Sequence, residues 1–521
     1  MTFGSVFESD QAGGDATSAS TEALRSPDLD SDSTLVVGKN ACLSLGVDTV
    51  TVYDEGLKTK SRQRCCGVSI STSDFPDEDI FSEPQVSRSI PLFNVLWAEL
   101  SDTYITIKFA EEISKTDVAV GSVHYAVSQE QKSKAERWIE RLLDSAYGEA
   151  QRQKRIKILI NPFGGKGRAT KSYFKEVEPI LAAAKCEIDA ESTTYRGHAV
   201  DIVEKLDINA YDVVAACSGD GIPYEIFNGL GKKANAGEAL AKIAVAHIPA
   251  GSGNAMCWNL NGTGSPSMAA LCMVKGLRTP FDLVSVTQGD RRTLSFLSQS
   301  FGIIAESDLG TENIRWMGPA RFTYGFLTRL LGKTVYPCDL AVKVEIGDKQ
   351  KIKDHYHAGV QKKAPEQTTN GDSSSESAGL PTLRYGSIND PLPADWTLVH
   401  HDKLGNFYAG NMAFMAGDAN FFPASLPNDG FMDLVTINGD ISRRTALQMM
   451  LGVENGTLFD MPDVNVRKIS GYRIIPRDRK EGYISIDGEQ VPFEPFQTEV
   501  HKGLGTVLSR SGYKYMTDGM K

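Results

Sequence analysis

Three segments in the middle of the chain repeat one plan: an apolar run of strand type, a loop of small residues, and the start of a helix. They are RIKILINPFGGKGRA at 155–169, YDVVAACSGDGIPYEIFNGL at 211–230 and KIAVAHIPAGSGNAMCWNL at 242–260. Alternating strands and helices predict a parallel α/β sheet, because each helix returns the chain to begin the next strand in the same direction. The three loops are therefore expected to meet at the carboxyl edge of that sheet.

Two regions precede this α/β lobe, which we place at residues 151–285. Residues 1–33 are acidic and poor in apolar groups, which predicts a disordered tail. Runs such as TVTVYD and YITIKFA then alternate as strands do, and a helix follows with Ser128 and Gln131 positioned as a capping box. The apolar positions on one face of this helix are Ala135, Trp138, Ile139, Leu142, Leu143 and Ala146. Strands closed by one C-terminal helix predict a module at 34–150 that is similar to a pleckstrin-homology (PH) fold.

Strand-type runs dominate again after about Phe281, among them LSFLSQSFGIIA, NFYAGNMAFMA and YISIDGEQVPF. They predict a β-rich domain at 286–515, packed beside the α/β lobe. A polar stretch rich in Ser, Thr and Gly interrupts this domain at 348–395. Because its composition gives it little to bury, we expect a disordered insertion, which is also a candidate for phosphorylation.

Composition and charge exclude several classes of protein. With 55 Lys and Arg against 66 Asp and Glu, the net charge of −11 argues against a nucleic-acid partner, although a local basic cleft stays open. Eight cysteines without a CxxC pair favour a reducing compartment. The chain has no secretory start and no apolar run of the roughly 18 residues that cross a bilayer, so we expect a cytoplasmic protein that meets membranes peripherally. Cys65 and Cys66 follow basic residues and could accept a palmitoyl chain, with two ordinary strand cysteines as the alternative.

The first loop, NPFGGKGR, follows a strand and opens a helix. Its glycines let backbone N–H groups close around phosphate oxygens, and Lys166 and Arg168 add positive charge. The GxxxxGK[ST] spacing of a P-loop is absent, so no hydroxyl is positioned there to hold magnesium. A glycine turn that only reverses the chain is the alternative interpretation.

The second loop places Asp220 between two glycines directly after the apolar strand VVAAC. A carboxylate at such a strand end suits a group that takes a proton from a hydroxyl, or one that holds Mg²⁺ near phosphates. Glu225, on the following helix, could hold Mg²⁺ or the water shell of a phosphate. A turn aspartate with a local Asx hydrogen bond is the alternative for Asp220. The third loop, PAGSGNA, is another small-residue turn, and three such loops at successive strand ends indicate a bound nucleotide.

Together these loops resemble the sphingosine kinase family, within the diacylglycerol-kinase-like lipid kinases. NPFGGKG, SGDG and PAGSGNA match three blocks of that family, and FGIIAESDLGTENIRWMGPARFTYG at 301–325 and ISIDGEQVPF at 484–493 match two more. Diacylglycerol kinases usually carry GGDG, so SGDG with GSGNA favours the sphingoid-base branch. Pro223 and Tyr224 look most like the fungal long-chain-base kinases. The resemblance covers about 154–345 and 398–510.

The resemblance implies roles for individual residues. Asp220 would be the base that activates the primary hydroxyl of the lipid. Asp308 would recognise the amino and secondary hydroxyl groups of the substrate, with Glu306, two residues earlier in strand-like spacing, as a second candidate. Asp487 and Glu489 would reach from the second domain toward the metal or the phosphates. The residues expected around the nucleotide are Asn161, Gly164, Gly165, Lys166, Gly167, Thr193, Ser218, Gly219, Gly221, Glu225, Gly251, Ser252, Gly253, Asn254, Arg315, Arg321, Asp487, Gly488 and Glu489.

The lipid tail needs an apolar slot near Asp308. The expected walls are Phe301, Ile303, Ile304, Phe322, Phe326, Leu327, Leu330, Leu331, Met412, Phe414 and Met415. The alternative is that these apolar residues, which recur at helical spacing, belong to the ordinary hydrophobic core. His247 is expected to pack or to form a hydrogen bond within its strand. Asp429 and Asp433 are expected to be structural.

The sequence thus predicts a kinase that uses ATP and Mg²⁺ to phosphorylate sphingosine, dihydrosphingosine or phytosphingosine at the primary hydroxyl. A diacylglycerol or ceramide kinase is the alternative enzyme, and Asp308 separates the two because neither alternative substrate carries a free amine. A catalytically inactive lipid-binding scaffold is the alternative from a different class. The sequence assigns no individual metal ligand, and it leaves the organelle, the chain length of the substrate and the oligomeric state open, a homodimer included.

Overall fold

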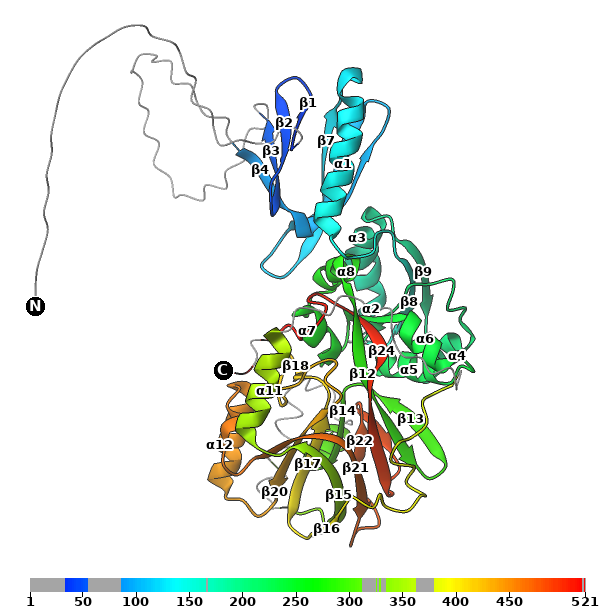
Figure 1. Ribbon diagram of the computed structural model, residues 1–521, viewed down its shortest axis with the longest axis vertical. Helices are drawn as coiled ribbons and strands as arrows, with labels where there is room; N and C mark the ends of the chain where they lie inside the picture. Colours follow the sequence, from blue (N-terminus) through cyan, green and yellow to red (C-terminus); the bar gives the residue numbers. More distant parts are fainter. Residues whose placement is uncertain are drawn as a thin grey trace, which may run out of the picture.

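The structure of the protein is a computed structural model. It describes residues 33–54, 86–164, 167–311, 325, 328, 334–361, 379–517 and 520. In Figure 1 the described chain forms three parts, with an N-terminal β module at the top, the α/β lobe beneath it and a β-rich part at the bottom. Residues 1–32 of the predicted tail, and Cys65 and Cys66, lie outside the described residues.

The N-terminal module consists of two antiparallel sheets and one helix. The first sheet contains β1 (Thr34–Val37), β2 (Ala41–Leu45), β3 (Thr49–Asp54) and β4 (Val86–Pro91), and the second contains β5 (Val95–Leu100), β6 (Tyr104–Glu112) and β7 (Val118–Ala126). Helix α1 (Lys132–Tyr147) buries every apolar position predicted for it. The predicted capping box is wrong, because a 3₁₀ turn over Gln129–Gln131 follows Ser128 and no side chain caps α1.

The module and the α/β lobe share one hydrophobic core, in which Leu96 and Ile107 of the module belong with Ile158 and Leu181 of the lobe. Two buried lysines also hydrogen-bond at this junction. The Lys275 ammonium donates to the carbonyl of Ala146 in the last turn of α1 at 2.9 Å, and that of Lys154 donates to Val274 in the last turn of α8 (Pro266–Lys275) at 2.6 Å. The partly negative carbonyl end of a helix attracts a cation, but burial lowers the pKa of Lys275 to about 7 and that of Lys154 to about 8.

The α/β lobe carries the predicted parallel strands. β8 (Arg155–Ile160), β9 (Glu187–Ser192), β10 (Val213–Ser218) and β11 (Ala244–Pro249) lie side by side in the order β11-β10-β8-β9. Every neighbouring pair among them is parallel. The helices of the lobe are α2 (Ala169–Ser172), α3 (Glu178–Ala183), α4 (His198–Lys205), α5 (Gly221–Gly231), α6 (Ala236–Lys242), α7 (Ala255–Asn261) and α8.

The β-rich part continues the same sheet. Its long strands β12 (Leu277–Gln288) and β24 (Phe496–Ser509) pair with each other, and β24 also pairs with β11 of the lobe. The predicted boundary at 285/286 therefore falls inside β12, whose strand runs down from the lobe in Figure 1. The other elements are β13 (Arg291–Ser295), β14 (Ser298–Gly302), α9 (Ile303–Leu309), β15 (Cys338–Ile346), α11 (Lys349–Gln361), β16 (Leu398–His401), β17 (Leu404–Gly410), β18 (Phe414–Ala416), β19 (Ala419–Asn420), β20 (Met432–Asn438), α12 (Arg443–Glu454), β21 (Asn465–Pro476), β22 (Ile484–Ile486) and β23 (Glu489–Val491).

Two predictions for this part are wrong in detail. The run LSFLSQSFGIIA is not one strand, because it contains the end of β13, all of β14 and the start of α9. The predicted disordered insertion at 348–395 is also too long. It begins with α11, and at its other end the backbone N–H groups of Arg384 and Tyr385 donate to Glu499 at 2.9 and 2.7 Å. Residues 362–378 lie outside the described residues.

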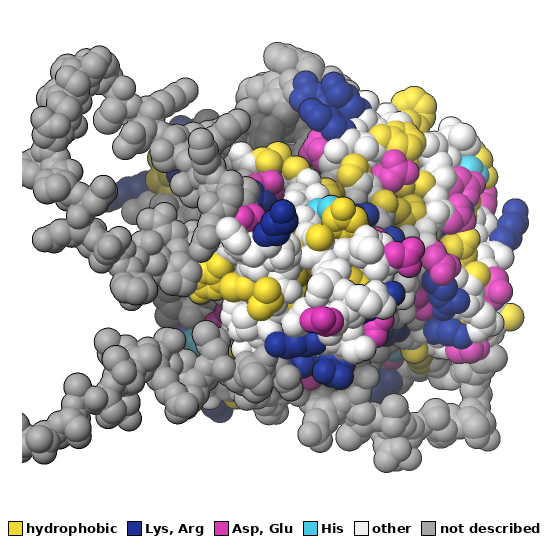
Figure 2. All heavy atoms as spheres, turned by 90° about the horizontal axis from the view of Figure 1, so that it is seen from above, with side chains coloured by type: hydrophobic (Ala, Val, Ile, Leu, Met, Phe, Trp, Pro, Cys, Tyr) yellow, Lys and Arg dark blue, Asp and Glu magenta, His cyan; other side chains and the backbone are white. Residues whose placement is uncertain are grey.

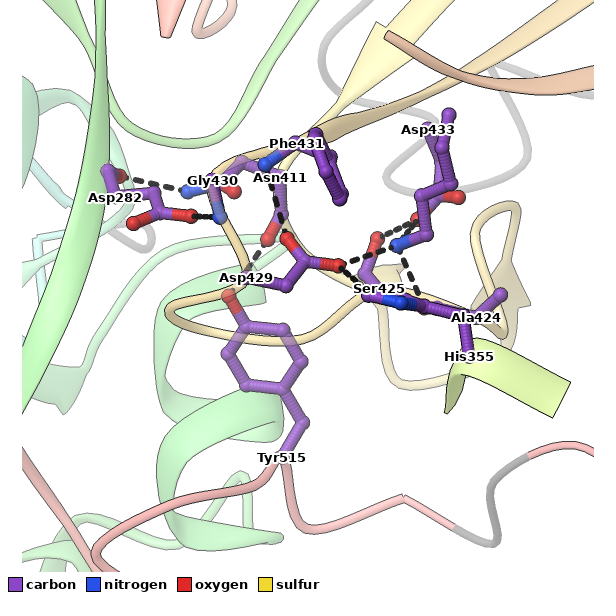
Figure 3. Close-up of polar contacts among 11 residues, drawn as sticks. Asp282, His355, Asn411, Ala424, Ser425, Asp429, Gly430, Phe431, Asp433 and Tyr515 are labelled. Atoms are coloured by element: carbon purple, nitrogen blue, oxygen red, sulfur yellow. Dashed lines mark hydrogen bonds and ion pairs between the residues drawn. The ribbon is translucent and has the colours of Figure 1, made fainter. Parts of the chain in front are cut away.

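A buried charged cluster supports the β-rich part (Figure 3). The fully buried Lys468 ammonium donates to the carboxylates of Asp429 at 3.0 Å and Asp433 at 3.2 Å, and to the Ala424 carbonyl at 2.8 Å. The Asp429 carboxylate also lies 3.1 Å from Nε2 of His355. Through these contacts the two carboxylates bind Lys468 and hold neighbouring segments together, which supports a structural role for Asp429 and Asp433.

Asp282 borders this cluster and is expected to make stability depend on pH. Its carboxylate accepts the N–H groups of Gly430 at 2.6 Å and Gly503 at 2.7 Å, while burial and the nearby charge of Asp429 raise the pKa of Asp282 to about 7. An unfolded aspartate titrates near 3.9. Between about pH 4 and about pH 7 the folded state therefore binds more protons, so the free energy of unfolding falls as the pH rises. Urea unfolding across this window measures the slope, and Asp282→Asn should flatten it; an equal slope in the variant would contradict this assignment.

The surface of the upper end mixes charges of both signs. In Figure 2, basic and acidic side chains are interspersed, with hydrophobic ones scattered between them, as on an ordinary solvent-exposed face. Within the described ranges, no helix combines the length and apolar character needed to span a bilayer.

Candidate active site

The three glycine loops meet at the carboxyl ends of β8, β10 and β11. A β-carbon added to Gly251 would lie only 2.3 Å from Cα of Gly219, so the second and third loops touch backbone to backbone. A β-carbon on Gly164 would lie 3.6 Å from the carbonyl oxygen of Ala250, which brings the first loop beside the third. Glycine is required at position 251 because any side chain there would collide with the backbone of Gly219.

The first loop is shaped by its own polar groups. The Asn161 side-chain oxygen accepts the N–H of Phe163 at 3.0 Å, and the N–H of Gly167 donates to the Gly164 carbonyl at 2.9 Å. Gly167 has a φ of 73°, a conformation that favours glycine. Gly165 and Lys166 lie outside the described residues, so their predicted phosphate contacts stay predictions.

Asp220 projects from the second loop to the start of α7. One carboxylate oxygen accepts the N–H of Ala255 at 3.0 Å and the other that of Met256 at 3.1 Å. These partners belong to the third loop and its helix, so Asp220 is held by distant backbone and not by a local Asx turn. Its side chain is 16% exposed, which leaves it open to a substrate.

The third loop is closed by Asn254, which has a left-handed φ of 53°. Its side-chain oxygen accepts the N–H of Gly251 at 2.8 Å, and its amide nitrogen donates to the Gly251 carbonyl at 3.0 Å. The Ser252 side chain is exposed at the tip of this loop, whereas Ser218 is buried and donates to the Gly219 carbonyl at 2.6 Å. Ser252 is therefore better placed than Ser218 to meet a phosphate.

Two residues predicted to contact the nucleotide form hydrogen bonds within the protein. The Glu225 carboxylate accepts the N–H groups of Gly197 at 2.9 Å and Ala199 at 3.0 Å and so caps α4, and burial raises the pKa of Glu225. Thr193 is buried and its hydroxyl lies 3.4 Å from the Ile160 carbonyl at the end of β8. Glu225 therefore holds the start of α4 and Thr193 contacts the end of β8, while the predicted nucleotide contacts of both residues stay predictions.

Asp487 and Glu489, at the turn between β22 and β23, have different surroundings. Asp487 is buried, and its carboxylate accepts the hydroxyl of Ser295 at 2.7 Å and the N–H groups of Phe296, Leu297 and Ser298 at 2.8–2.9 Å. Burial raises the pKa of Asp487 to about 6. Asp487 thus fixes the loop between β13 and β14, and its predicted contact with the metal or the phosphates stays a prediction. Gly488, with a φ of 82°, completes the turn.

Glu489 does reach the glycine loops. Its carboxylate would lie 3.4 Å from a β-carbon on Gly221, and it forms an ion pair with Arg196. Arg196 was not predicted, although a basic residue in a loop after a strand end is a usable signal. Both side chains border a cavity of about 290 Å³ between the lobe and the β-rich part, which Tyr224, Gln288 and Arg291 also line.

The segment carrying Asp308 is helix α9, not a strand, which changes the relation between its two acids. Residues two apart on a helix point about 200° apart, so Glu306 and Asp308 face different surroundings. Glu306 accepts the hydroxyl of Tyr336. Asp308 is half-buried on the side of Tyr408, and burial together with the Asp308 charge raises the pKa of that tyrosine. The predicted substrate contacts of Asp308 and Glu306 stay predictions.

The predicted walls of the lipid slot fall into separate apolar clusters. Phe301 and Ile303 belong to one cluster and Met412 to a second, while Ile304, of α9, and Met415 are each partly buried against a third. The predicted lipid slot stays a prediction. The residues outside the described ranges are Arg315, Arg321, Phe322, Phe326, Leu327, Leu330 and Leu331.

Comparison with known proteins places two regions of the chain in families. Residues 155–286 match the diacylglycerol kinase catalytic domain, and residues 33–148 match a domain of unknown function. The first match begins at β8 and ends within β12, so it contains all three glycine loops.

The chain is also similar to full-length proteins. It is 36% identical over 431 residues to sphingoid long chain base kinase 5 of Saccharomyces cerevisiae, covering 73% of this chain and 63% of that relative. It is 31% identical over 463 residues to sphingoid long chain base kinase 4 of Schizosaccharomyces pombe, covering 88% and 96%. It is 28% identical over 367 residues to human sphingosine kinase 1, covering 68% and 91%.

Proposed function

Since the chain belongs to the sphingoid long-chain-base kinase family, we propose that it transfers the γ-phosphate of ATP to the primary hydroxyl of a sphingoid base. The observation that carries this proposal is Asp220, a partly exposed carboxylate where the three glycine loops meet. Sphingosine, dihydrosphingosine and phytosphingosine are the proposed substrates.

In the proposed reaction Asp220 takes the proton of the lipid hydroxyl. The hydroxyl oxygen forms a bond to the γ-phosphorus, the bond from that phosphorus to the β,γ-bridging oxygen breaks, and its electrons stay on ADP. Because the transition state is loose, positioning and positive charge provide most of the catalysis. The N–H groups of Ala255 and Met256 hold Asp220 in place, and exposed Ser252 is available to the phosphates.

Mg²⁺ would be held mainly by the phosphates of ATP. No three His, Cys, Asp or Glu side chains gather into a metal site among the residues that the structure describes. Magnesium commonly binds through one or two carboxylates together with phosphates and water, and Glu489, beside Gly221, is the acid that fits this role. When bound, the ion neutralises charge on the phosphates.

Asp308 is proposed to bind the ammonium of the sphingoid base, and Asp308→Asn is expected to weaken that contact. Hydrogen bonds to charged groups contribute about 1.5–3 kcal/mol, which predicts a loss of about 10- to 150-fold in kcat/KM for sphingoid bases. The KM for ATP should change little. Steady-state kinetics measure both values, and Glu306→Gln, on another side of the same helix, is the comparison expected to lose less. Equal losses in the two variants would argue against an ammonium site at Asp308.

A substrate panel with radiolabelled ATP tests the function directly. Sphingoid bases, ceramide and diacylglycerol are compared in the same detergent micelles. Preferential labelling of the free amines is expected, because only these substrates can use the Asp308 carboxylate. Equal labelling of diacylglycerol or ceramide would favour the alternative enzyme, and labelling of none would favour a lipid-binding scaffold.

We further propose a cytoplasmic protein that meets membranes peripherally and uses a PH-like N-terminal module. Two antiparallel sheets closed by the C-terminal helix α1 support the likeness to a PH fold. A reducing compartment is supported by the free state of the six cysteines that the structure describes. Since the proposed substrate resides in bilayers, the kinase must reach a membrane surface.

A further inference from the structure

A histidine lies directly beneath the proposed base. His247 is in β11 and is 1% exposed, so its imidazole is closed off from solvent. Its Nε2 lies 2.9 Å from the carbonyl oxygen of Ser218, at the end of the neighbouring strand β10. A carbonyl oxygen only accepts hydrogen bonds, so Nε2 carries the hydrogen and Nδ1 is left with a lone pair.

The other ring nitrogen faces Asp220. Nδ1 has no hydrogen-bond partner among the described residues, and it lies 3.9 Å from a carboxylate oxygen of Asp220. Both atoms are acceptors in the resting state. A proton between them would convert this unfavourable pair into a hydrogen bond, and catalytic hydrogen bonds that are long without substrate often shorten in the reacting complex.

The surroundings keep the imidazole neutral. Burial lowers the pKa of His247, and burial raises the pKa of the nearby Cys257 thiol, on α7, so that it also stays uncharged. Glu489, beside Gly221, forms an ion pair with Arg196. Asp220 is thus the charged group that faces the free Nδ1.

We infer that His247 is a positioning residue for the base, accepting at Nδ1 a hydrogen bond from the proton that Asp220 takes from the lipid hydroxyl. This inference rests on the proposed function. The proton stays on the carboxyl oxygen, is shared with the Nδ1 lone pair, and returns to solvent when the products leave. His247 thereby stabilises the state of the site after proton transfer without contacting substrate.

His247→Gln is the diagnostic variant, because a glutamine amide can reproduce the Nε2 hydrogen bond to Ser218 but places no acceptor at Nδ1. A fall in kcat of about 2- to 10-fold is expected, the scale of one hydrogen bond between uncharged groups, with the KM for ATP little changed. The acidic limb of the kcat–pH profile should move to lower pH by at most about one unit, since the protonated base has lost its acceptor. A purely structural histidine would leave the position of that limb unchanged.

His501→Gln is the matched control, because His501 is also a strand histidine whose side chain is mostly covered, and it lies 2.8 Å from the Ser285 hydroxyl. In the His501→Gln variant the acidic limb of the kcat–pH profile should lie at the same pH as in the wild type. ¹⁵N-detected NMR of the imidazoles, with His247→Gln identifying the resonance, should show a neutral ring protonated at Nε2 at neutral pH. A charged ring, the other tautomer, or a His247→Gln profile equal to the wild type overturns the inference. Failure of the unmodified enzyme to phosphorylate any sphingoid base instead overturns the proposed function, and the NMR result still tests His247.

Discussion

Asp220→Asn is expected to lower kcat for sphingoid-base phosphorylation by about 10²- to 10⁴-fold, the usual contribution of a positioned general base. The asparagine keeps the size of the side chain but cannot take the proton of the lipid hydroxyl. Asparagine keeps one acceptor oxygen for the N–H groups of Ala255 and Met256 and turns its NH₂ group toward the other, so ATP binding should weaken, but much less than turnover. Single-turnover phosphate transfer and nucleotide binding by calorimetry measure the two effects separately.

Asp212→Asn provides a matched control for this experiment. Asp212 directly precedes β10, at the opposite end of the strand from Asp220, and its side chain has the same exposed fraction of 16%. It also accepts a backbone N–H, that of Arg155 at 2.8 Å. The control should lose some stability but keep its turnover. If Asp220→Asn loses no more activity than Asp212→Asn, Asp220 is not the base.

Lys468→Met is expected to destabilise the protein by about 3–5 kcal/mol, the cost of leaving buried charge without its partner. Burial opposes the charge of Lys468, but Asp429 and Asp433 outweigh it and raise the pKa of Lys468. Methionine fills much of the same volume and removes the ammonium, so two buried carboxylates then face each other (Figure 3). Urea unfolding measures the change in the free energy of unfolding.

Two further variants separate charge from packing in this cluster. Lys403→Met removes one partner of an exposed ion pair with Asp440, and such pairs contribute only about 0–1 kcal/mol. Combining Lys468→Met with Asp429→Asn and Asp433→Asn removes all three charges and should recover part of the lost stability. A loss in Lys468→Met no larger than in Lys403→Met would show that the buried charges do not depend on Lys468.

The elements that depend on short sequence patterns could be predicted from the sequence. Glycines after apolar runs predicted the parallel strands and their shared edge, because each signal lies within about twenty residues. The buried face of α1 followed equally from its spacing, with Trp138 and Leu142 fully inside. Matches to five sequence blocks then pointed to the family, which the similarity to long-chain-base kinases shows.

Long-range partners could not be read in the same way. Asp487 looked like an active-site acid because it belongs to the IDGE block, yet its acceptor capacity is used by a loop nearly two hundred positions away. The strand expected at Phe301 continues as α9 because a short apolar run is compatible with either structure. Arg196 became a candidate site residue only through its ion pair with Glu489, and that contact forms only in the folded chain.

The pairing of β12 with β24 has a consequence for turnover. Contacts run from Leu277 opposite Ser509 to Thr287 opposite Gln497, with one irregularity between Phe281 and Leu283. A hydrogen-bonded pair of strands of this length resists a hinge motion that would move the α/β lobe and the β-rich part away from each other. Any motion of the two parts relative to each other therefore has to twist this pair of strands, and we expect substitutions at the irregularity to change the rate of ADP release.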